Sequence, residues 1–117
     1  MTSKKITPND FDVITLDLND SNFSEFTNDG ISLVDVWAPW WGPCKTIGPI
    51  IDKLSSDYKD SDIKFGKLNA DDNSEIVKTL GVRNIPTVLI FKNGEVVGKQ
   101  VGVAPKKTYT DAIDALL

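Results

Sequence analysis

The side chains with the clearest chemical potential are one thiol and the aromatic groups beside it, in the segment Trp40-Trp41-Gly42-Pro43-Cys44. Two cysteines separated by two residues form a dithiol that exchanges electrons with a disulfide. Cys44 stands at the second of these positions, and Trp41 stands at the first. Indole has no sulfur nucleophile, and the chain has no other cysteine. The segment therefore has the spacing of a dithiol site but lacks its attacking thiol.

The Cys44 thiol has two interpretations. As a reactive group, it would form a mixed disulfide, a glutathione adduct or a disulfide bond to a second copy of the chain. As a structural group, it would be a small buried hydrophobe, as most free cysteines are. The bulk of Trp41 at the entrance favours the buried interpretation.

A carboxylate inside an apolar segment is the second unusual feature. Asp35 interrupts the run Ile31–Trp37. This run otherwise suits a strand of a parallel sheet that is covered on both faces. Burying a charge is costly unless the charge is paired or protonated, so we expect the pKa of Asp35 to be raised.

Composition narrows the classes of function. The chain has 117 residues, of which 40% are apolar and 26% charged, and this balance suits one folded domain. Its net charge of −4 argues against nucleic acid or an anionic membrane as the main partner. With no histidine and one cysteine, we expect neither a metal site nor any other cofactor.

The sequence also bears on location. No segment reaches the roughly 20 apolar residues that span a bilayer, and the polar start of the chain lacks the pattern of a secretory signal. A single cysteine cannot form an internal disulfide, so no oxidising compartment is implied. We therefore expect a cytoplasmic protein without membrane contact.

The elements that must position these residues alternate between strands and helices. Apolar runs predict strands at residues 13–16, 31–37, 63–68, 87–91 and 95–101. Helices are expected after Asp20 or Ser21, from Pro43, from Asp72 and from Pro105. The order β-α-β-α-β-α-β-β-α predicts an α/β fold with a mixed sheet of about five strands flanked by four helices. Residues 1–12 are expected to be a loose lead-in to one domain at 13–117.

Several residues mark where elements begin, bend and turn. Pro49 should kink the helix that starts at Pro43, because it cannot donate the backbone hydrogen bond of its turn. Glu75, three residues after Asp72, predicts a capping box. Asn93-Gly94 predicts a tight turn, so the last two strands should form an antiparallel hairpin.

This order of elements resembles the thioredoxin family, and motifs at its joints support the resemblance from about Val13 to the C-terminus. The motifs are, in chain order, Val34-Asp35-Val36-Trp37-Ala38, Trp40, Gly42-Pro43-Cys44-Lys45, Pro49, Lys67, Ile85-Pro86-Thr87, Phe91-Lys92-Asn93-Gly94 and Gly102. Each motif alone is weak. All of them together, in this order, identify the chain as a member of the family.

The resemblance implies a thioredoxin fold and the activity of a protein-disulfide oxidoreductase. In the family, an exposed first cysteine attacks a substrate disulfide, and a second, shielded cysteine resolves the mixed disulfide. Cys44 matches the resolving cysteine, and Trp41 takes the place of the attacking one. Asp35 matches the proton acceptor of the resolving cysteine, with Lys67 as its partner. Without the attacking thiol, this pair either keeps that task or remains as a buried polar pair.

The resemblance also implies a groove that binds an extended peptide by strand addition. The Ile85-Pro86 bond is expected to be cis and to face this groove, while Trp37 and Trp40 are expected to pack under and beside the active-site loop. The residues expected to bind substrate are Trp40, Gly42, Pro43, Ile85, Pro86, Gly102 and Val103. The expected partners are protein or peptide substrates and a thioredoxin reductase, and the expected state is a monomer.

From these residues we expect dithiol catalysis to be absent or strongly impaired. Three alternatives remain open. In the first, Trp41 is an anchor of a non-catalytic module that binds a peptide or a partner protein. In the second, Cys44 acts as a monothiol. In the third, Trp41 is an introduced substitution in an otherwise ordinary member of the family.

Overall fold

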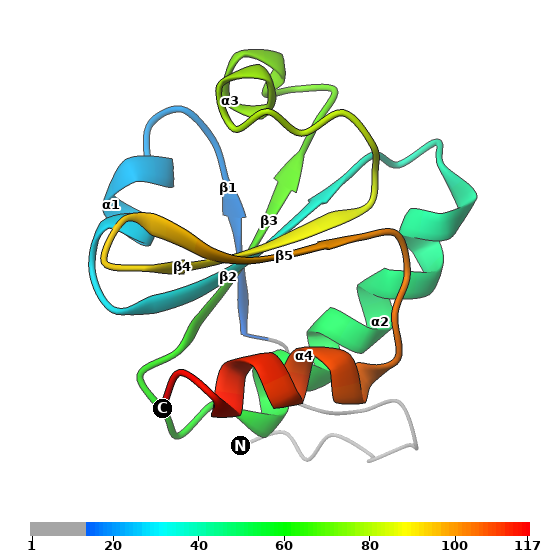
Figure 1. Cartoon of the computed structure of the whole chain (residues 1–117). Helices are drawn as coiled ribbons and strands as arrows, with labels where there is room; N and C mark the ends of the chain where they lie inside the picture. The colour runs from blue at the N-terminus through cyan, green and yellow to red at the C-terminus, as the bar shows by residue number, and fades with distance from the viewer. Residues whose placement is uncertain (1–13) are drawn as a thin grey trace, which may run out of the picture.

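The computed structural model describes residues 14–117, and the expected lead-in at residues 1–12 lies outside the described residues. The elements are β1 (Thr15–Leu18), α1 (Phe23–Asn28), β2 (Ile31–Trp37), α2 (Gly42–Asp57), β3 (Lys64–Asn69), α3 (Ser74–Thr79), β4 (Thr87–Lys92), β5 (Glu95–Val101) and α4 (Lys106–Asp114). Figure 1 shows them along the chain. The predicted order of strands and helices is confirmed, although β1 ends at Leu18, two residues later than expected.

In the described residues, five strands form one mixed sheet in the order β1-β3-β2-β4-β5. β1, β3 and β2 run parallel, β4 runs antiparallel to β2, and β5 runs antiparallel to β4. The apolar run of β2 lies at the centre, as expected for a strand covered on both faces. Asn93 and Gly94, both at positive φ, join β4 to β5 in the predicted hairpin.

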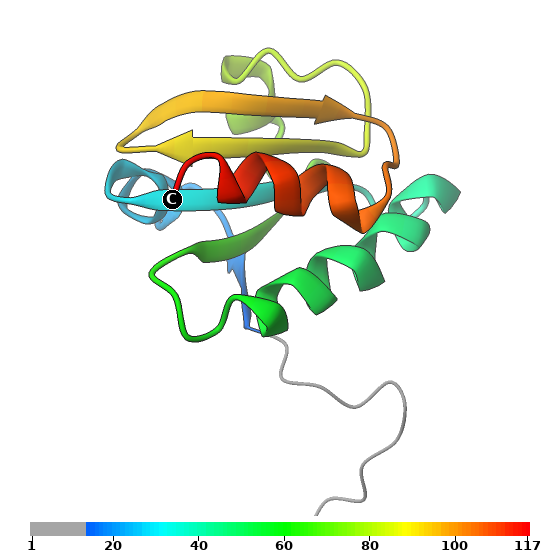
Figure 2. The same cartoon turned by 60° about the horizontal axis from the view of Figure 1, so that its bottom comes forward.

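Each face of the sheet carries its own apolar core, because alternate residues of a strand point to opposite sides. On one side, α2 and α4 cover Leu33 of β2 and Phe65 of β3. On the other side, α1 and α3 cover Val34 of β2 and Leu68 of β3. Figure 2 shows α2 and α4 together on one side of the sheet. A residue two positions after Leu33 therefore faces α2, and that residue is Asp35.

Three loops meet at one end of the sheet. In the register, Val36 of β2 pairs with Thr87 of β4, and Thr87 pairs with Val101 of β5. The loop from β2 into α2, the loop that leads into β4 and the loop that leaves β5 therefore lie at this end, as Figure 2 shows. The family motifs of the sequence are concentrated in these loops.

Two predicted helix caps are wrong, and the side chains of Asn19 and Asn69 form turns ahead of the two helices. The residue before α1 is Asn22 rather than Asp20 or Ser21, and the residue before α3 is Asn73 rather than Asp72. Oδ1 of Asn19 accepts hydrogen bonds from the backbone N–H groups of Ser21 and Asn22, which moves the start of α1 forward. The Asn73 amide donates to the carbonyl of Asn69, so it does not cap α3.

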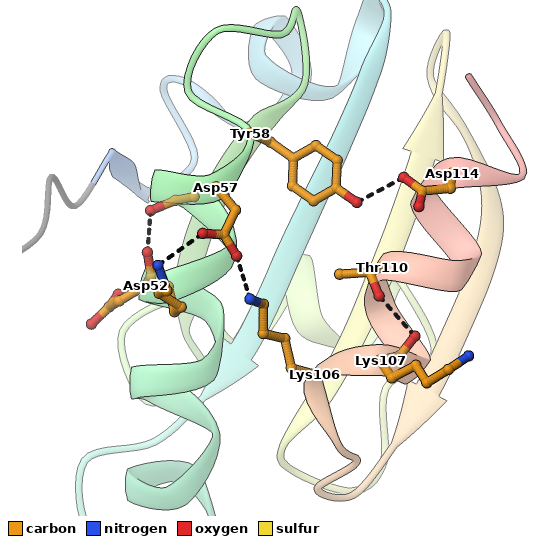
Figure 3. Close-up of polar contacts among 9 residues, drawn as sticks. Asp52, Asp57, Tyr58, Lys106, Lys107, Thr110 and Asp114 are labelled. Carbon is orange, nitrogen blue, oxygen red and sulfur yellow. Dashed lines mark hydrogen bonds and ion pairs between the residues drawn. The ribbon is translucent and has the colours of Figure 1, made fainter.

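Polar contacts hold the C-terminal end of α2 against α4 (Figure 3). Asp57 of α2 forms an ion pair with Lys106 at the start of α4. Tyr58, which follows α2, donates a hydrogen bond to Asp114 of α4, with 2.8 Å between the two oxygens. Asp57 also pairs with Lys53, at 2.9 Å between nitrogen and oxygen. These contacts fix one end of α2, whereas its first turn lies at the other end, where the three loops meet.

Candidate functional site

Asp35 lies at the centre of the sheet beneath α2. It follows Leu33 by two residues in β2, so its side chain points to the face that α2 covers. Only 1% of Asp35 is exposed, and its Oδ1 atom has no hydrogen-bond partner among the described residues. Its neighbours in the register are Lys67 of β3 and Val88 of β4. The predicted burial of Asp35 is confirmed.

A row of residues on α2 faces the same region. Cys44, Gly48 and Asp52 follow one another at intervals of four residues, which places them along one side of the helix. Asp52 forms an ion pair with Lys67, with 2.6 Å between Oδ1 and Nζ. Lys67 is thus adjacent to Asp35 in the sheet register, but its direct ion pair is with Asp52 of the helix.

Two residues of this region were not singled out from the sequence. Asp52 could have been found, because its spacing from Cys44 places it on the side of the helix that faces the buried carboxylate. Asp71 could not: its carboxylate accepts a hydrogen bond from Nε1 of Trp40 at 3.0 Å. The two residues are far apart in the chain, and no local pattern indicates their pairing.

Asp35 has a strongly raised pKa, and burial is the main cause. Burial raises the pKa of Asp35 from its ordinary value of 3.8 to about 7. The positive charge of Lys67 opposes this rise, and the negative charge of Asp52 adds to it. The Asp35 carboxyl group can therefore gain or lose a proton near neutral pH.

A cavity of about 220 Å³ joins the predicted chemical residues. Its lining residues are Asp35, Trp37, Pro39, Cys44, Lys45, Gly48 and Lys67. The structure thus brings together the carboxylate from β2, the ammonium group from β3 and the thiol from α2. These three side chains were predicted from separate motifs, and here they border one space.

The Cys44 thiol is shielded from solvent, with 4% of the residue exposed. Burial raises the pKa of this thiol above its ordinary value of 9.0. A backbone hydrogen bond from Ala38 opposes the rise, and the charge of Asp35 adds to it. The prediction that Cys44 is buried is confirmed, and its reactivity stays a prediction.

Trp41 occupies the position immediately before α2, where extended backbone leads into the helix. Its carbonyl accepts a hydrogen bond from the Cys44 N–H, with 3.1 Å between nitrogen and oxygen. The residue is 43% exposed, and its ring meets that of Trp40 edge to face, with 5.8 Å between centroids. Gly42 and Pro43 then form the start of α2, as predicted.

Trp40 differs from the expectation that it packs beside the active-site loop. It is 64% exposed, the most open of the tryptophans. Its Nε1 atom donates to Asp71 in the loop after β3, so the polar edge of the ring is fixed while most of the side chain remains exposed. Trp37, by contrast, is half-buried at the end of β2.

The loops before β4 and after β5 are joined by a backbone hydrogen bond. The Gly102 N–H donates to the Pro86 carbonyl, with 2.8 Å between nitrogen and oxygen. The Ile85-Pro86 bond is cis, as expected, and Gly102 has a φ of 82°, which favours glycine. Val103 beside it is exposed. These residues gather at the end of the sheet where the register also places Trp41.

Two further observations concern what the chain can bind. Across residues 14–117, no group of three or more His, Cys, Asp or Glu side chains could hold a metal ion. None of the helices in this part of the chain is long and apolar enough to cross a membrane. The ionisable side chains that line the cavity are one thiol, Cys44, one carboxylate, Asp35, and two lysines, Lys45 and Lys67.

Comparisons with known proteins agree with this geometry. The sequence profile of the family described as Thioredoxin matches residues 14–115. The M-type chloroplastic thioredoxin of Spinacia oleracea is 46% identical over 103 residues, which are 86% of this chain and 56% of that protein. The chain therefore spans little more than half of that relative's length. The thioredoxin of Bacillus subtilis is 41% identical over 95 residues, which are 81% of this chain and 90% of that protein.

Solved structures show the same fold. The thioredoxin of Malassezia sympodialis superposes with a TM-score of 0.80 at 31% identity, covering 89% of this chain and 92% of that chain. The predicted thioredoxin fold, with its mixed sheet and flanking helices, is confirmed. With one cysteine, the chain lacks the two-cysteine dithiol of a redox-active member. The chain belongs to the thioredoxin family.

Proposed function

We propose that this chain is a thioredoxin-like protein of the protein-disulfide oxidoreductase class in which dithiol–disulfide exchange is absent or strongly impaired. One observation carries the proposal: Trp41 precedes α2, and the chain's single thiol, Cys44, is buried behind it. The start of a helix is where a thiol would be exposed and where the helix dipole would favour its thiolate. An indole in that place cannot supply the nucleophile.

The stoichiometry of disulfide reduction supports this conclusion. A dithiol supplies two electrons: its first thiolate attacks one sulfur of the substrate, and its second thiolate attacks the mixed disulfide and releases the reduced substrate. Cys44 alone would stop at the mixed disulfide. Its burial also keeps a protein disulfide away from its sulfur. Turnover therefore requires a thiol at position 41.

The rest of the site favours an activity that one substitution can create. Asp35 borders the same cavity as Cys44 and titrates near neutral pH, so it can accept the proton of a resolving thiol. Lys67 lies beside it in the sheet. We infer that Trp41→Cys turns the chain into a dithiol reductase.

Reduction of insulin by dithiothreitol, followed as turbidity, tests this proposal. The unchanged chain should accelerate the reaction little or not at all, and Trp41→Cys should accelerate it at least about tenfold. Trp41→Ser is the matched control, because it removes the indole without adding a thiol, and it should remain inactive. Rapid turnover by the unchanged chain would overturn the proposal. An inert Trp41→Cys variant would show that other parts of the site no longer support exchange.

A second candidate function is the binding of an extended peptide or partner without electron transfer. Exposed apolar side chains at the end of the sheet favour it, namely Trp40, Trp41, Val101 and Val103. Aromatic side chains often anchor protein interfaces. The probe is insulin B chain with blocked thiols and a fluorescent label. Trp41→Ala should weaken its binding at least about tenfold, and unchanged affinity would count against Trp41 as the anchor.

We also propose a monomeric state, a cytoplasmic location and a thioredoxin reductase as a partner, because these properties go with the oxidoreductase class. Gel filtration with and without reductant tests the state of the chain. A dimer linked through Cys44 would appear only without reductant, and Cys44→Ser would remove it. A dimer that persists in Cys44→Ser would contradict the monomer.

A further inference from the structure

The cavity beside Cys44 contains a polar atom that lacks a partner. Asp35 is 1% exposed, and its Oδ1 atom accepts no hydrogen bond from the described residues, yet it lines the same space as the thiol. Buried carboxylate oxygens are in most cases hydrogen-bonded. A small polar molecule in this cavity would satisfy the carboxylate and meet the sulfur. This observation does not depend on the proposed function.

The dimensions of the cavity limit what can reach the thiol. Cys44 is only 4% exposed, and Trp37 and Pro39 form part of the wall. A volume of about 220 Å³ admits hydrogen peroxide, which is little larger than a water molecule. Oxidised glutathione, with six amino acid residues, is too large to enter. The depth of Cys44 in this pocket therefore favours small reactants over bulky ones.

We propose that Cys44 is a site of oxidation by small peroxides, with Asp35 as the group that accepts the thiol proton inside the cavity. The reaction forms one S–O bond and breaks one O–O bond. The Cys44 thiolate attacks one peroxide oxygen and becomes a sulfenic acid, while the other oxygen leaves as hydroxide. The proton held by Asp35 then passes to this hydroxide and gives water. Sulfur loses two electrons, and the peroxide gains them.

The charges around the cavity suit these steps. Asp35, whose pKa is about 7, can take and return a proton at neutral pH. Burial raises the pKa of Cys44, so little thiolate forms without a base, but a thiolate of high pKa is a strong nucleophile. Lys67 lines the cavity and places positive charge beside the leaving hydroxide.

Intact-mass measurement of the reduced full chain in hydrogen peroxide tests the proposal. The unchanged chain should gain one oxygen more than Cys44→Ser, in which Met1 is the remaining sulfur-containing side chain. Asp35→Asn should slow the oxidation of Cys44 at least about tenfold, with its fold checked by circular dichroism. No oxidation of the folded chain, or an unchanged rate in Asp35→Asn, would overturn the proposal.

The reaction rates of Cys44 with reagents of different size show whether the thiol lies in a cavity or is exposed at the surface. Methyl methanethiosulfonate transfers only a thiomethyl group, whereas oxidised glutathione transfers a tripeptide. Unfolding should accelerate the reaction of Cys44 with oxidised glutathione at least about tenfold more than the reaction with the small reagent. Equal acceleration would overturn the selection by size.

Filling the cavity provides a second, independent test. No heavy atom lies within 4 Å of a Cβ built at Gly48, so this position accepts a side chain. Gly48→Leu should slow the oxidation of Cys44 at least about tenfold, because it occupies the space that the peroxide needs. Thr46→Leu, exposed on the same helix, is the matched control and should leave the rate unchanged. Equal rates in the two variants would overturn the placement of the reaction in the cavity.

Discussion

The burial that raises the pKa of Asp35 also destabilises the folded chain at neutral pH. Its pKa rises from 3.8 to about 7 on folding, so between these values the folded chain holds a proton that the unfolded chain releases. The contribution of Asp35 to the free energy of unfolding therefore does not change with pH below about pH 4. It decreases as the pH rises from about 4 to about 7, and it stays at this lower value at higher pH. At about 1.4 kcal/mol per pKa unit, the full loss is about 4 kcal/mol.

Asp35→Asn should remove this pH-dependent loss, because an amide does not ionise. Relative to the unchanged chain, the variant should gain about 4 kcal/mol more at pH 8 than at pH 4. Urea unfolding followed by circular dichroism at both pH values measures the difference. An equal effect of Asp35→Asn at both pH values would show that this carboxylate does not titrate as described.

The chemical residues of the site could be predicted because each one breaks a local rule. Asp35 is a charge in an apolar strand, and Trp41 and Cys44 stand at the spacing of a dithiol. Asp52 breaks no such rule, since an acidic residue is ordinary on an amphipathic helix. Its spacing from Cys44 gives its side of the helix, but its ion pair with Lys67, at 2.6 Å, is seen only once β3 is placed beside α2. A role that depends on a distant partner leaves little trace in the local sequence.

At the scale of elements, the strands and helices could be predicted where the signal is local. The apolar run of β2 and the Asn93-Gly94 turn gave the central strand and the hairpin. The helix starts could not be predicted, because several neighbouring polar side chains compete for the same backbone groups. The side chains of Asn19 and Asn69 accept hydrogen bonds from backbone N–H groups that follow them, and neither helix start has a side-chain cap.

The junction between α2 and α4 should depend more on a hydrogen bond than on an ion pair. The Tyr58 hydroxyl donates to Asp114, and burial, with this bond, raises the pKa of Tyr58 to about 12. Tyr58→Phe should lower the free energy of unfolding by about 1 kcal/mol. Lys106→Gln breaks only a partly exposed ion pair with Asp57 and should lower it by less. Thermal unfolding of both variants measures the difference.

Lys107→Gln is the control for this junction. Lys107 pairs with Asp111, one turn further along α4, so the contact lies within one helix. Its removal should leave the docking of α4 on α2 unchanged. If Lys106→Gln destabilised the chain more than Tyr58→Phe, charge rather than the hydrogen bond would hold the two helices together.

At the scale of the whole molecule, two cores share one sheet. β2, β3 and β4 each contribute alternate residues to the core beneath α2 and α4 and to the core beneath α1 and α3. Loss of packing on one face therefore loosens strands on which the other face depends. The domain should consequently unfold in one cooperative transition.

Leu54→Ala and Leu68→Ala test this cooperativity from opposite faces. Leu54 of α2 and Leu68 of β3 are fully buried, each in a different core. Each substitution should lower the free energy of unfolding by about 2–5 kcal/mol. Fluorescence of the tryptophans, which cluster at the loop end of the sheet, should still give the same midpoint as circular dichroism, which reports all elements. Different midpoints from the two probes in Leu54→Ala would show that the α2 side separates from the sheet before the rest unfolds.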